Sequence, residues 1–314
     1  MPAPTVTFRP LPLPEFHLLR RPEADGAHKA AAASDAGAAD RATGFYLERT
    51  EEAVAAFGTG IAPTRFQFYF IGVVEKSSAT CTTGLASFPV GPRTAFFVPP
   101  GQIHSSRGWT TRDRGFALSF SDAFFSENLA DKRRLAQSPL FRWERPPFLA
   151  LTPAEHAETR TLLAALATEW TARRAANAAL LRALLHAVVA RLEAAALRAQ
   201  PARLELDANA RLHERFREKL ERDFRREKSP AAYAAALGVH PNHFATAIRA
   251  ASGLPPGDWI RARLVLEAQC LLAASTQGVK QIAAELGYDD EAYFSRLFKK
   301  AVGVSPRDYQ RGAA

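Results

Sequence analysis

The pattern of hydrophobic and polar positions changes twice along the chain of 314 residues. Between residues 45 and 118, β-branched and aromatic runs such as "RFQFYFIGVV" alternate with proline and glycine turns, which is typical of strands. Short strands separated by turns predict a small β-barrel or jelly roll. We place this domain at residues 45–150.

Beyond Phe125 the apolar residues recur at helical spacing, and we place a helical segment at residues 151–200. Thr152 and Glu155 have the spacing of a capping box at the start of the first helix. The second helix carries a broad apolar stripe. The stripe either packs on its own domain or forms the seam of a homodimer; the candidate seam residues are Leu181, Leu184, Leu185, Val188 and Leu192.

Two polar stretches mark further boundaries. Residues 1–44 contain a stretch of small residues that cannot bury enough apolar surface to order itself, and we expect an extended, flexible segment. Residues 201–210 are polar, contain Pro201 and predict a linker. Residues 211–314 then have helical periodicity throughout. The fold class we expect is therefore α+β and multidomain, with an N-terminal β-barrel, a helical dimerisation segment and a C-terminal all-α domain.

The last domain contains an internal repeat. Ala234, Leu237 and Gly238 match Ala283, Leu286 and Gly287 at an offset of 49 residues, and Phe244, Ile248 and Gly253 match Phe294, Phe298 and Gly303 at an offset of 50. Each copy fits a helix, a turn with glycine just after the helix end, and a second helix. Two such copies predict two helix-turn-helix units, at about 229–253 and 278–303.

The second helix of each unit has one apolar and one polar face. In the later unit the period of about 3.6 residues puts Phe294 and Phe298 in the core and leaves Ser295, Arg296 and Lys299 facing outward. Such side chains can hydrogen-bond to base edges or pair with phosphates. Two helical hairpins with solvated outer faces remain the alternative. A helix of about five turns, near residues 255–275, would separate the units on the scale of one DNA turn, about 34 Å.

The stretch "IAAELGYDDEAYFSRLFKKAVGVSPRDYQR" resembles the C-terminal signature of the AraC/XylS-type transcription regulators, and the likeness covers about residues 212–311. This resemblance implies a bipartite domain that binds direct-repeat half-sites in double-stranded DNA and usually activates transcription through RNA polymerase. Carried over to this sequence, base reading falls on Asn242, His243, Thr246, Glu291, Ala292, Ser295 and Arg296. Contacts to the DNA backbone fall on Arg249, Lys280, Lys299 and Lys300.

The phrases "FQFYFIGVVEKSS", "FFVPPGQIHSS" and "GFALSFSDAFF" resemble the cupin-like effector domain of the same family. The resemblance implies an effector pocket, for which the candidates are Arg65, Gln67, Tyr69 and His104; Arg65 would suit a carboxylate. The positions that carry metal ligands in cupins are occupied by Thr64, Phe66 and Phe70, which leaves His104 alone. We therefore expect no metal and no cofactor.

Charge and cysteine content agree with this view. The net charge of +9 and the pI near 9.9 favour a polyanionic partner such as DNA. Two cysteines, Cys81 and Cys270, make no disulfide framework and fit a reducing cytoplasm. The sequence has no secretory signal and no apolar run of about 18 residues, so we expect no membrane span.

Together these patterns predict a sequence-specific DNA-binding transcription regulator, a homodimeric activator controlled by a small molecule in the barrel. The alternative is a regulator with no effector, whose N-terminal domain serves only for dimerisation or partner binding. A barrel filled by Phe66, Phe68, Phe70, Phe96 and Phe97 would favour that alternative, because a packed interior leaves no cavity. A third possibility, a cupin enzyme, is weak because no metal triad, phosphate-binding glycine loop or nucleophile elbow is present.

Overall fold

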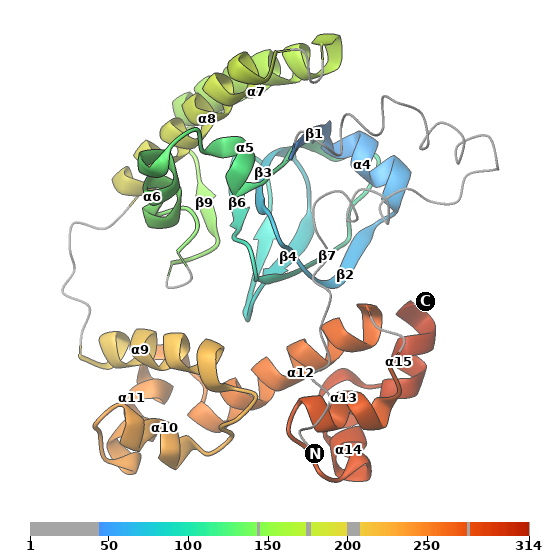
Figure 1. Cartoon of the computed structure of the whole chain (residues 1–314), viewed down its shortest axis with the longest axis vertical. Helices are drawn as coiled ribbons and strands as arrows, with labels where there is room; N and C mark the ends of the chain where they lie inside the picture. The colour runs from blue at the N-terminus through green and yellow to red at the C-terminus, as the bar shows by residue number, and fades with distance from the viewer. Residues whose placement is uncertain (1–43, 143–144, 174–176, 200–207, 275–276, 314) are drawn as a thin grey trace. The chain divides into compact units, whose positions relative to one another are not determined.

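The computed structural model describes residues 44–142, 145–173, 177–199, 208–274 and 277–313 (Figure 1). These residues fall into two compact units, which we describe separately: a β-rich unit before residue 200 and a helical unit after it. The segment predicted to be flexible, residues 1–44, lies outside the described residues except for Gly44. Most of the predicted linker lies outside them too, and its last residues, from Ala208, already belong to a helix.

The β-rich unit contains two sheets with antiparallel strand pairs (Figure 1). The five-stranded sheet has the order β1 (Phe45–Arg49), β8 (Arg114–Phe120), β3 (Tyr69–Lys76), β6 (Thr94–Val98) and β9 (Phe148–Ala150). The four-stranded sheet has the order β2 (Gly60–Arg65), β7 (Ile103–Arg107), β4 (Ala79–Thr83) and β5 (Ala86–Val90).

The side chains of strand β3 show that the five-stranded sheet packs against a different neighbour on each face. Ile71 and Val73 belong to the core shared with the helices, whereas Phe70 and Val74 belong to the core shared with the four-stranded sheet. Successive side chains of a strand point to opposite faces. Because both faces are covered, the strand is apolar almost throughout.

Five helices belong to the described residues of this unit: α4 (Thr50–Phe57), α5 (Asp122–Phe125), α6 (Leu129–Gln137), α7 (Pro153–Arg173) and α8 (Ala178–Arg198). The predicted capping box at the start of α7 is confirmed. The Thr152 Oγ1 accepts from the Glu155 amide at 3.2 Å, and Glu155 Oε2 accepts from the Thr152 amide at 2.8 Å. Arg198 at the end of α8 donates to both oxygens of the Glu155 carboxylate, which joins the two long helices.

The apolar stripe of α8 is buried within its own chain, so the predicted dimer seam is wrong. Leu181, Leu185, Val188 and Leu192 are at most 1% exposed, and Leu184 packs against the same core. The stripe is wide because it meets two neighbours, α7 and α5, rather than one. Of the two explanations that the periodicity left open, packing on its own domain is the one the structure has.

The helical unit contains seven helices among the described residues: α9 (Ala208–Asp223), α10 (Pro230–Ala236), α11 (Pro241–Ser252), α12 (Pro256–Ala274), α13 (Val279–Glu285), α14 (Glu291–Val302) and α15 (Pro306–Ala313). They enclose one hydrophobic core, to which every helix except α15 contributes fully buried side chains. Tyr309 of α15 packs against the edge of this core. The long helix α12 runs through the middle of the unit and contacts both helix pairs.

Within the described part of the chain, no helix combines the length and apolarity needed to cross a bilayer. The same residues contain no group of three or more His, Cys, Asp or Glu side chains that could hold a metal ion. Cys81 and Cys270 are both buried, form no disulfide and lie in different units.

Candidate nucleic-acid interface

The turns between α10 and α11 and between α13 and α14 have the same backbone geometry. Gly238 and Gly287 both have φ of +73°, a left-handed conformation that glycine adopts without steric cost. One residue later, the Val239 amide donates to the Ala234 carbonyl at 3.0 Å, and the Tyr288 amide donates to the corresponding alanine carbonyl at 2.9 Å. The predicted glycine turns are therefore present at both copies of the repeat.

Small residues let the helices of each pair pack closely. Ala234 in α10 and Ala283 in α13 are 0% and 1% exposed, and each lies in the core of the helical unit. The following helices bury Phe244 and Phe294 against the same core. The repeat found in the sequence is thus also a repeat of packing.

Helix α11 presents one polar face to solvent. Pro241 occupies its first turn, and the His240 ring accepts the Asn242 amide at 3.3 Å as the N-cap, although histidine is an uncommon residue there. The candidate side chains Asn242, His243, Thr246 and Arg249 are all exposed on the side away from the buried Phe244 and Ile248. The structure therefore brings the candidates of the first helix pair onto one surface.

Asp290 is the N-cap of helix α14, and its carboxylate accepts the Ala292 amide at 2.7 Å. An acidic residue is favourable at this end of a helix, because the exposed amides carry partial positive charge. Ala292, Arg296 and Lys299 lie on the face of this helix away from its buried phenylalanines, whereas Glu291, three residues before Phe294 and seven before Phe298, lies near their face. Ala292, Arg296, Lys299 and Lys300 are exposed, and Glu291 and Ser295 are partly exposed. Lys280, in the first turn of α13, is exposed as well.

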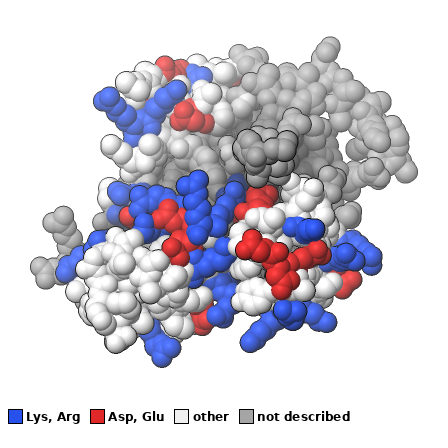
Figure 2. Space-filling model, turned by 60° about the horizontal axis from the view of Figure 1, so that its bottom comes forward, with Lys and Arg blue, Asp and Glu red and all other residues white. Residues whose placement is uncertain are grey.

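The two candidate surfaces differ in charge. Figure 2 shows a largely uncharged surface over α10 and α11, and charged side chains of both signs over α13 and α14. In sequence terms, α11 carries Arg249 as its one basic residue besides His243, whereas α14 carries Arg296, Lys299 and Lys300. Electrostatic attraction to phosphates should therefore be stronger at the second helix.

A network of ion pairs connects the helices that carry these surfaces. Arg263 of α12 lies 2.7 Å from Glu221 of α9 and 2.9 Å from Glu267 of its own helix. Arg225, in the segment after α9, lies 2.6 Å from Glu267 and 3.6 Å from Glu285 of α13. Burial raises the pKa of Glu285. The network thus ties α9, α12 and α13 together.

A second connection runs from the same segment to the turn of the later helix pair. The Lys228 ammonium donates to the Gly287 carbonyl at 2.8 Å and lies 5.0 Å from the centroid of the Tyr288 ring. A Cβ atom at Gly287 would lie 2.9 Å from the backbone carbonyl oxygen of Arg225, so this close backbone approach also requires glycine. The motifs in the sequence did not single out these residues. The available signal was the pair of opposite charges at positions 263 and 267, one turn apart in the mainly apolar stretch of the helix that follows Arg261.

In the β-rich unit, the structure separates the four candidate effector residues. A cavity of about 50 Å³ lies between the two sheets, and among its lining residues only His104 was predicted. Tyr69 was assigned wrongly, because it precedes Phe70 on β3 and points to the other face, where its ring packs on Phe120 and Phe141. Arg65 and Gln67 do not line this cavity either; Arg65 donates to the Gly101 carbonyl in the neighbouring loop.

Residues 233–312 match a family model described as a helix-turn-helix domain. The chain is 28% identical over 82 residues to the arabinose operon regulatory protein of Salmonella typhimurium, and 35% identical over 63 residues to the HTH-type transcriptional activator RhaR of Yersinia pseudotuberculosis. These stretches cover 26% and 20% of this chain and 29% and 22% of the relatives, so less than a third of each relative is matched. Both relatives are regulators rather than enzymes.

Two solved structures are also similar. The C-terminal domain of AraT, a response regulator from Geobacillus stearothermophilus, is 29% identical, covers 32% of this chain and 84% of that domain, and gives a TM-score of 0.31. ToxT from Vibrio cholerae is 13% identical, covers 85% of this chain and 98% of its own, and gives a TM-score of 0.40. The repeated glycine turns and the family match together identify residues 233–312 as a helix-turn-helix domain, and its sequence signature is similar to that of the AraC/XylS-type transcription regulators.

Proposed function

We propose that this protein is a sequence-specific DNA-binding transcription regulator that reads two half-sites with two helix-turn-helix units. Helices α11 and α14 are the reading helices, since each buries its apolar face and exposes side chains that can bond to base edges. The single observation that carries the proposal is the repetition of the same turn and helix pair on both sides of α12.

The spacing of the units supports binding to successive turns of one DNA face. Helix α12 has 19 residues, which corresponds to about 28 Å at a rise of about 1.5 Å per residue. Adjacent major-groove segments on one face of B-DNA lie about 34 Å apart. The ion pairs around Arg263 would hold the two reading helices at a fixed separation, which favours a direct repeat with defined spacing.

Base reading is assigned to Asn242, His243 and Thr246 in α11 and to Glu291, Ala292, Ser295 and Arg296 in α14. Phosphate contacts are assigned to Arg249, Lys280, Lys299 and Lys300. By its resemblance to the family, the regulator is proposed to act as an activator through contact with RNA polymerase.

The experiment that tests this function selects DNA from a random double-stranded library with the full chain and sequences what is retained. Enrichment of a motif with two half-sites about one helical turn apart supports the proposal. Retention that is uniform over the library, or absent at low salt, contradicts it. The matched control for replacing an arginine of a reading helix, such as Arg296, is Arg160→Ala. It removes one arginine at an exposed position of α7, outside the helical unit.

For the β-rich unit, the two roles considered from the sequence receive different support. Phe66, Phe68, Phe70 and Phe96 fill much of the space between its sheets, which supports a packed, cupin-like dimerisation or partner module. Phe97 lies in the other core, on the helix side of the sheet. The cavity of about 50 Å³ supports control by an effector only if that effector is small or displaces part of the wall.

A homodimer is proposed to form through the outer face of α8 rather than through its buried stripe. That face is lined by small side chains, with Ala183, Ala190 and Ala194 exposed along it. Leu180 near its start and Leu197 near its end are 41% and 61% exposed. Small residues allow two helices to approach closely, and the exposed leucines would lose water-accessible area on pairing.

A further inference from the structure

The cavity in the β-rich unit has an almost entirely apolar wall. It lies between the five-stranded and four-stranded sheets, where helix α4 covers one end. The wall includes the aromatic side chains of Phe70, Phe96, Trp109 and Phe116, and Val54 contributes from α4. The lining includes no Lys, Arg, Asp or Glu side chain of the described residues. A charged ligand would therefore lose its hydration without gaining a counterion.

Two polar side chains of β7 face this cavity. His104 is 2% exposed, and its Nδ1 lies 3.0 Å from the Thr83 hydroxyl, so that side of the ring is already engaged. Ser106, two residues further on the same face of the strand, is 8% exposed. Its Oγ is buried and has no hydrogen-bonding partner within the described part of the chain. Buried hydroxyl groups in native proteins are normally paired, so an unpaired one beside a cavity indicates a missing partner.

Glycines give the cavity its shape. A Cβ atom at Gly72 would lie 2.1 Å from the nearest Phe96 ring atom, so this ring lies flat against β3. The ring stacks on His104 at an interplanar angle of 9°. A Cβ atom at Gly60 would lie 2.4 Å from the Ser106 carbonyl, so β2 closely approaches the strand that carries the unpaired hydroxyl. Replacing either Gly72 or Gly60 by a residue with a Cβ atom would therefore close or distort the cavity.

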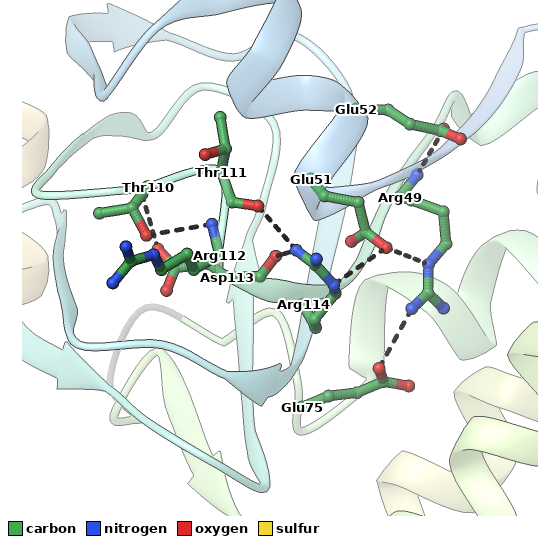
Figure 3. A network of polar contacts seen from close by, with 9 residues as sticks. All are labelled: Arg49, Glu51, Glu52, Glu75, Thr110, Thr111, Arg112, Asp113 and Arg114. Atoms are coloured by element: carbon green, nitrogen blue, oxygen red, sulfur yellow. Dashed lines mark hydrogen bonds and ion pairs between the residues drawn. The ribbon is translucent and has the colours of Figure 1, made fainter.

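Ion pairs hold the start of helix α4. Figure 3 shows Arg49, just before the helix, between Glu51 and Glu75, with ion-pair distances of 3.3 Å and 3.1 Å. Arg114 of β8 approaches Glu51 at 3.8 Å. The other end stops at Gly58, which has φ of +85° and no atom within 4 Å of the position a Cβ would take. At this end there is therefore open space beside the backbone of Gly58.

We propose that the cavity beneath α4 binds a small, uncharged, mainly apolar molecule with one hydrogen-bonding group, and that Ser106 Oγ is the partner of that group. At about 50 Å³ the cavity is smaller than the cavities of about 150 Å³ that admit benzene. A ring-sized ligand therefore displaces the end of α4 outward as it binds. The assignment deepens the proposed function, because this ligand would be the effector of the regulator.

The test uses phenol, toluene and benzoate, which differ in the hydrogen-bonding group and the charge on one ring. Binding to the full chain is measured by calorimetry and by shifts in the NMR spectrum. We expect phenol to bind more tightly than toluene and benzoate not to bind. Ser106→Ala should weaken phenol binding about three- to ten-fold and leave toluene binding unchanged. Ser105→Ala, on the opposite face of the same strand, is the matched control.

Val54→Phe fills the cavity from α4 and should abolish the binding of both phenol and toluene while the thermal transition is retained. The proposal is overturned if phenol and toluene bind equally to the wild-type chain, if benzoate binds best, or if the folded wild-type chain binds none of the three. Selection of DNA by the same preparation is measured separately. A chain that selects its DNA motif and fails these ligand tests refutes the ligand site and leaves the DNA-binding function intact.

Discussion

Arg263 and Glu267 form an ion pair of 2.9 Å one turn apart in α12, although their side chains are only 3% and 0% exposed. Charges buried to this extent are tolerated when each has a partner. Here Glu267 also accepts from Arg225 at 2.6 Å, and Arg263 also donates to Glu221 at 2.7 Å. The central helix therefore carries a closed set of charges that fixes its neighbours in one arrangement.

Removing one member of this set should be costly. We expect Glu267→Ala to lower the free energy of unfolding of the helical unit by about 3–5 kcal/mol, because Arg263 remains buried without its helix partner. Urea denaturation followed by far-UV circular dichroism measures the change. The control is Arg261→Ala, which removes an exposed pair with Asp258 and should cost no more than about 1 kcal/mol. Equal effects of the two substitutions would contradict a structural role for the buried network.

Arg296→Ala tests base reading by α14. We expect weaker binding to the selected DNA motif and a loss of about 1–3 kcal/mol of discrimination at one base position, since an arginine fork pairs best with guanine. Competition binding with single-base variants of the motif measures the discrimination. Arg160→Ala serves as the control. An unchanged base preference in the Arg296 variant would show that this side chain does not contact a base.

Lys299→Ala tests phosphate contact in the last turn of the same helix. Because a phosphate contact carries no sequence information, affinity should fall by a similar factor for all DNA sequences. The slope of log affinity against log salt should become shallower by about 0.9 for each phosphate that is no longer neutralised. Measurements between low and moderate salt determine the slope. An unaltered slope would mean that Lys299 faces solvent in the complex.

Patterns of short period in the sequence predicted local geometry well. The helical period placed Phe294 and Phe298 on the buried face of α14 and Arg296 on its exposed face. The glycines at 238 and 287 marked both turns. Features that depend on what packs against an element were not predictable. The periodicity of α8 showed that Leu185 would be buried but not that α5 and α7 would bury it within one chain.

The assignment of residues to an effector pocket was wrong for the same kind of reason. Alternation along β3 separates Tyr69 from Phe70, but it does not determine which of the two faces meets the second sheet. Ser106 carries no sequence signal at all, because its importance arises from the burial of a hydroxyl group without a partner among the described residues. Such information comes from the packing of strands that are far apart in sequence.

His213 should make the stability of the helical unit depend on pH. Burial, and to a smaller extent the nearby Arg217, lower the pKa of this histidine from 6.5 to about 4. The unfolded chain therefore takes up a proton as the pH falls below about 6.5, whereas the folded chain stays neutral until about 4. The free energy of unfolding should fall as the pH falls through this window and be unaffected by His213 above it.

Urea denaturation at pH 7.5 and pH 5.5 tests this dependence. The loss of stability between the two pH values should be smaller in His213→Gln than in the wild-type chain, because glutamine does not titrate. His243→Gln is the matched control, since His243 is exposed. If both variants retain the wild-type pH dependence, protonation of His213 does not oppose folding.

The dimer proposal is tested by two substitutions on opposite faces of α8. Leu185 is 0% exposed, and Leu185→Glu should destabilise the β-rich unit by more than about 3 kcal/mol, whatever the oligomeric state. Ala190 is exposed on the outer face, and Ala190→Arg should leave thermal stability of the monomer nearly unchanged but convert dimers to monomers.

Light scattering measures the mass of each variant. Ala165→Arg, at an exposed position of α7, controls for the added charge. If the Ala190→Arg variant remains dimeric, the interface lies elsewhere, whereas monomeric wild-type protein would remove homodimerisation from the proposed function.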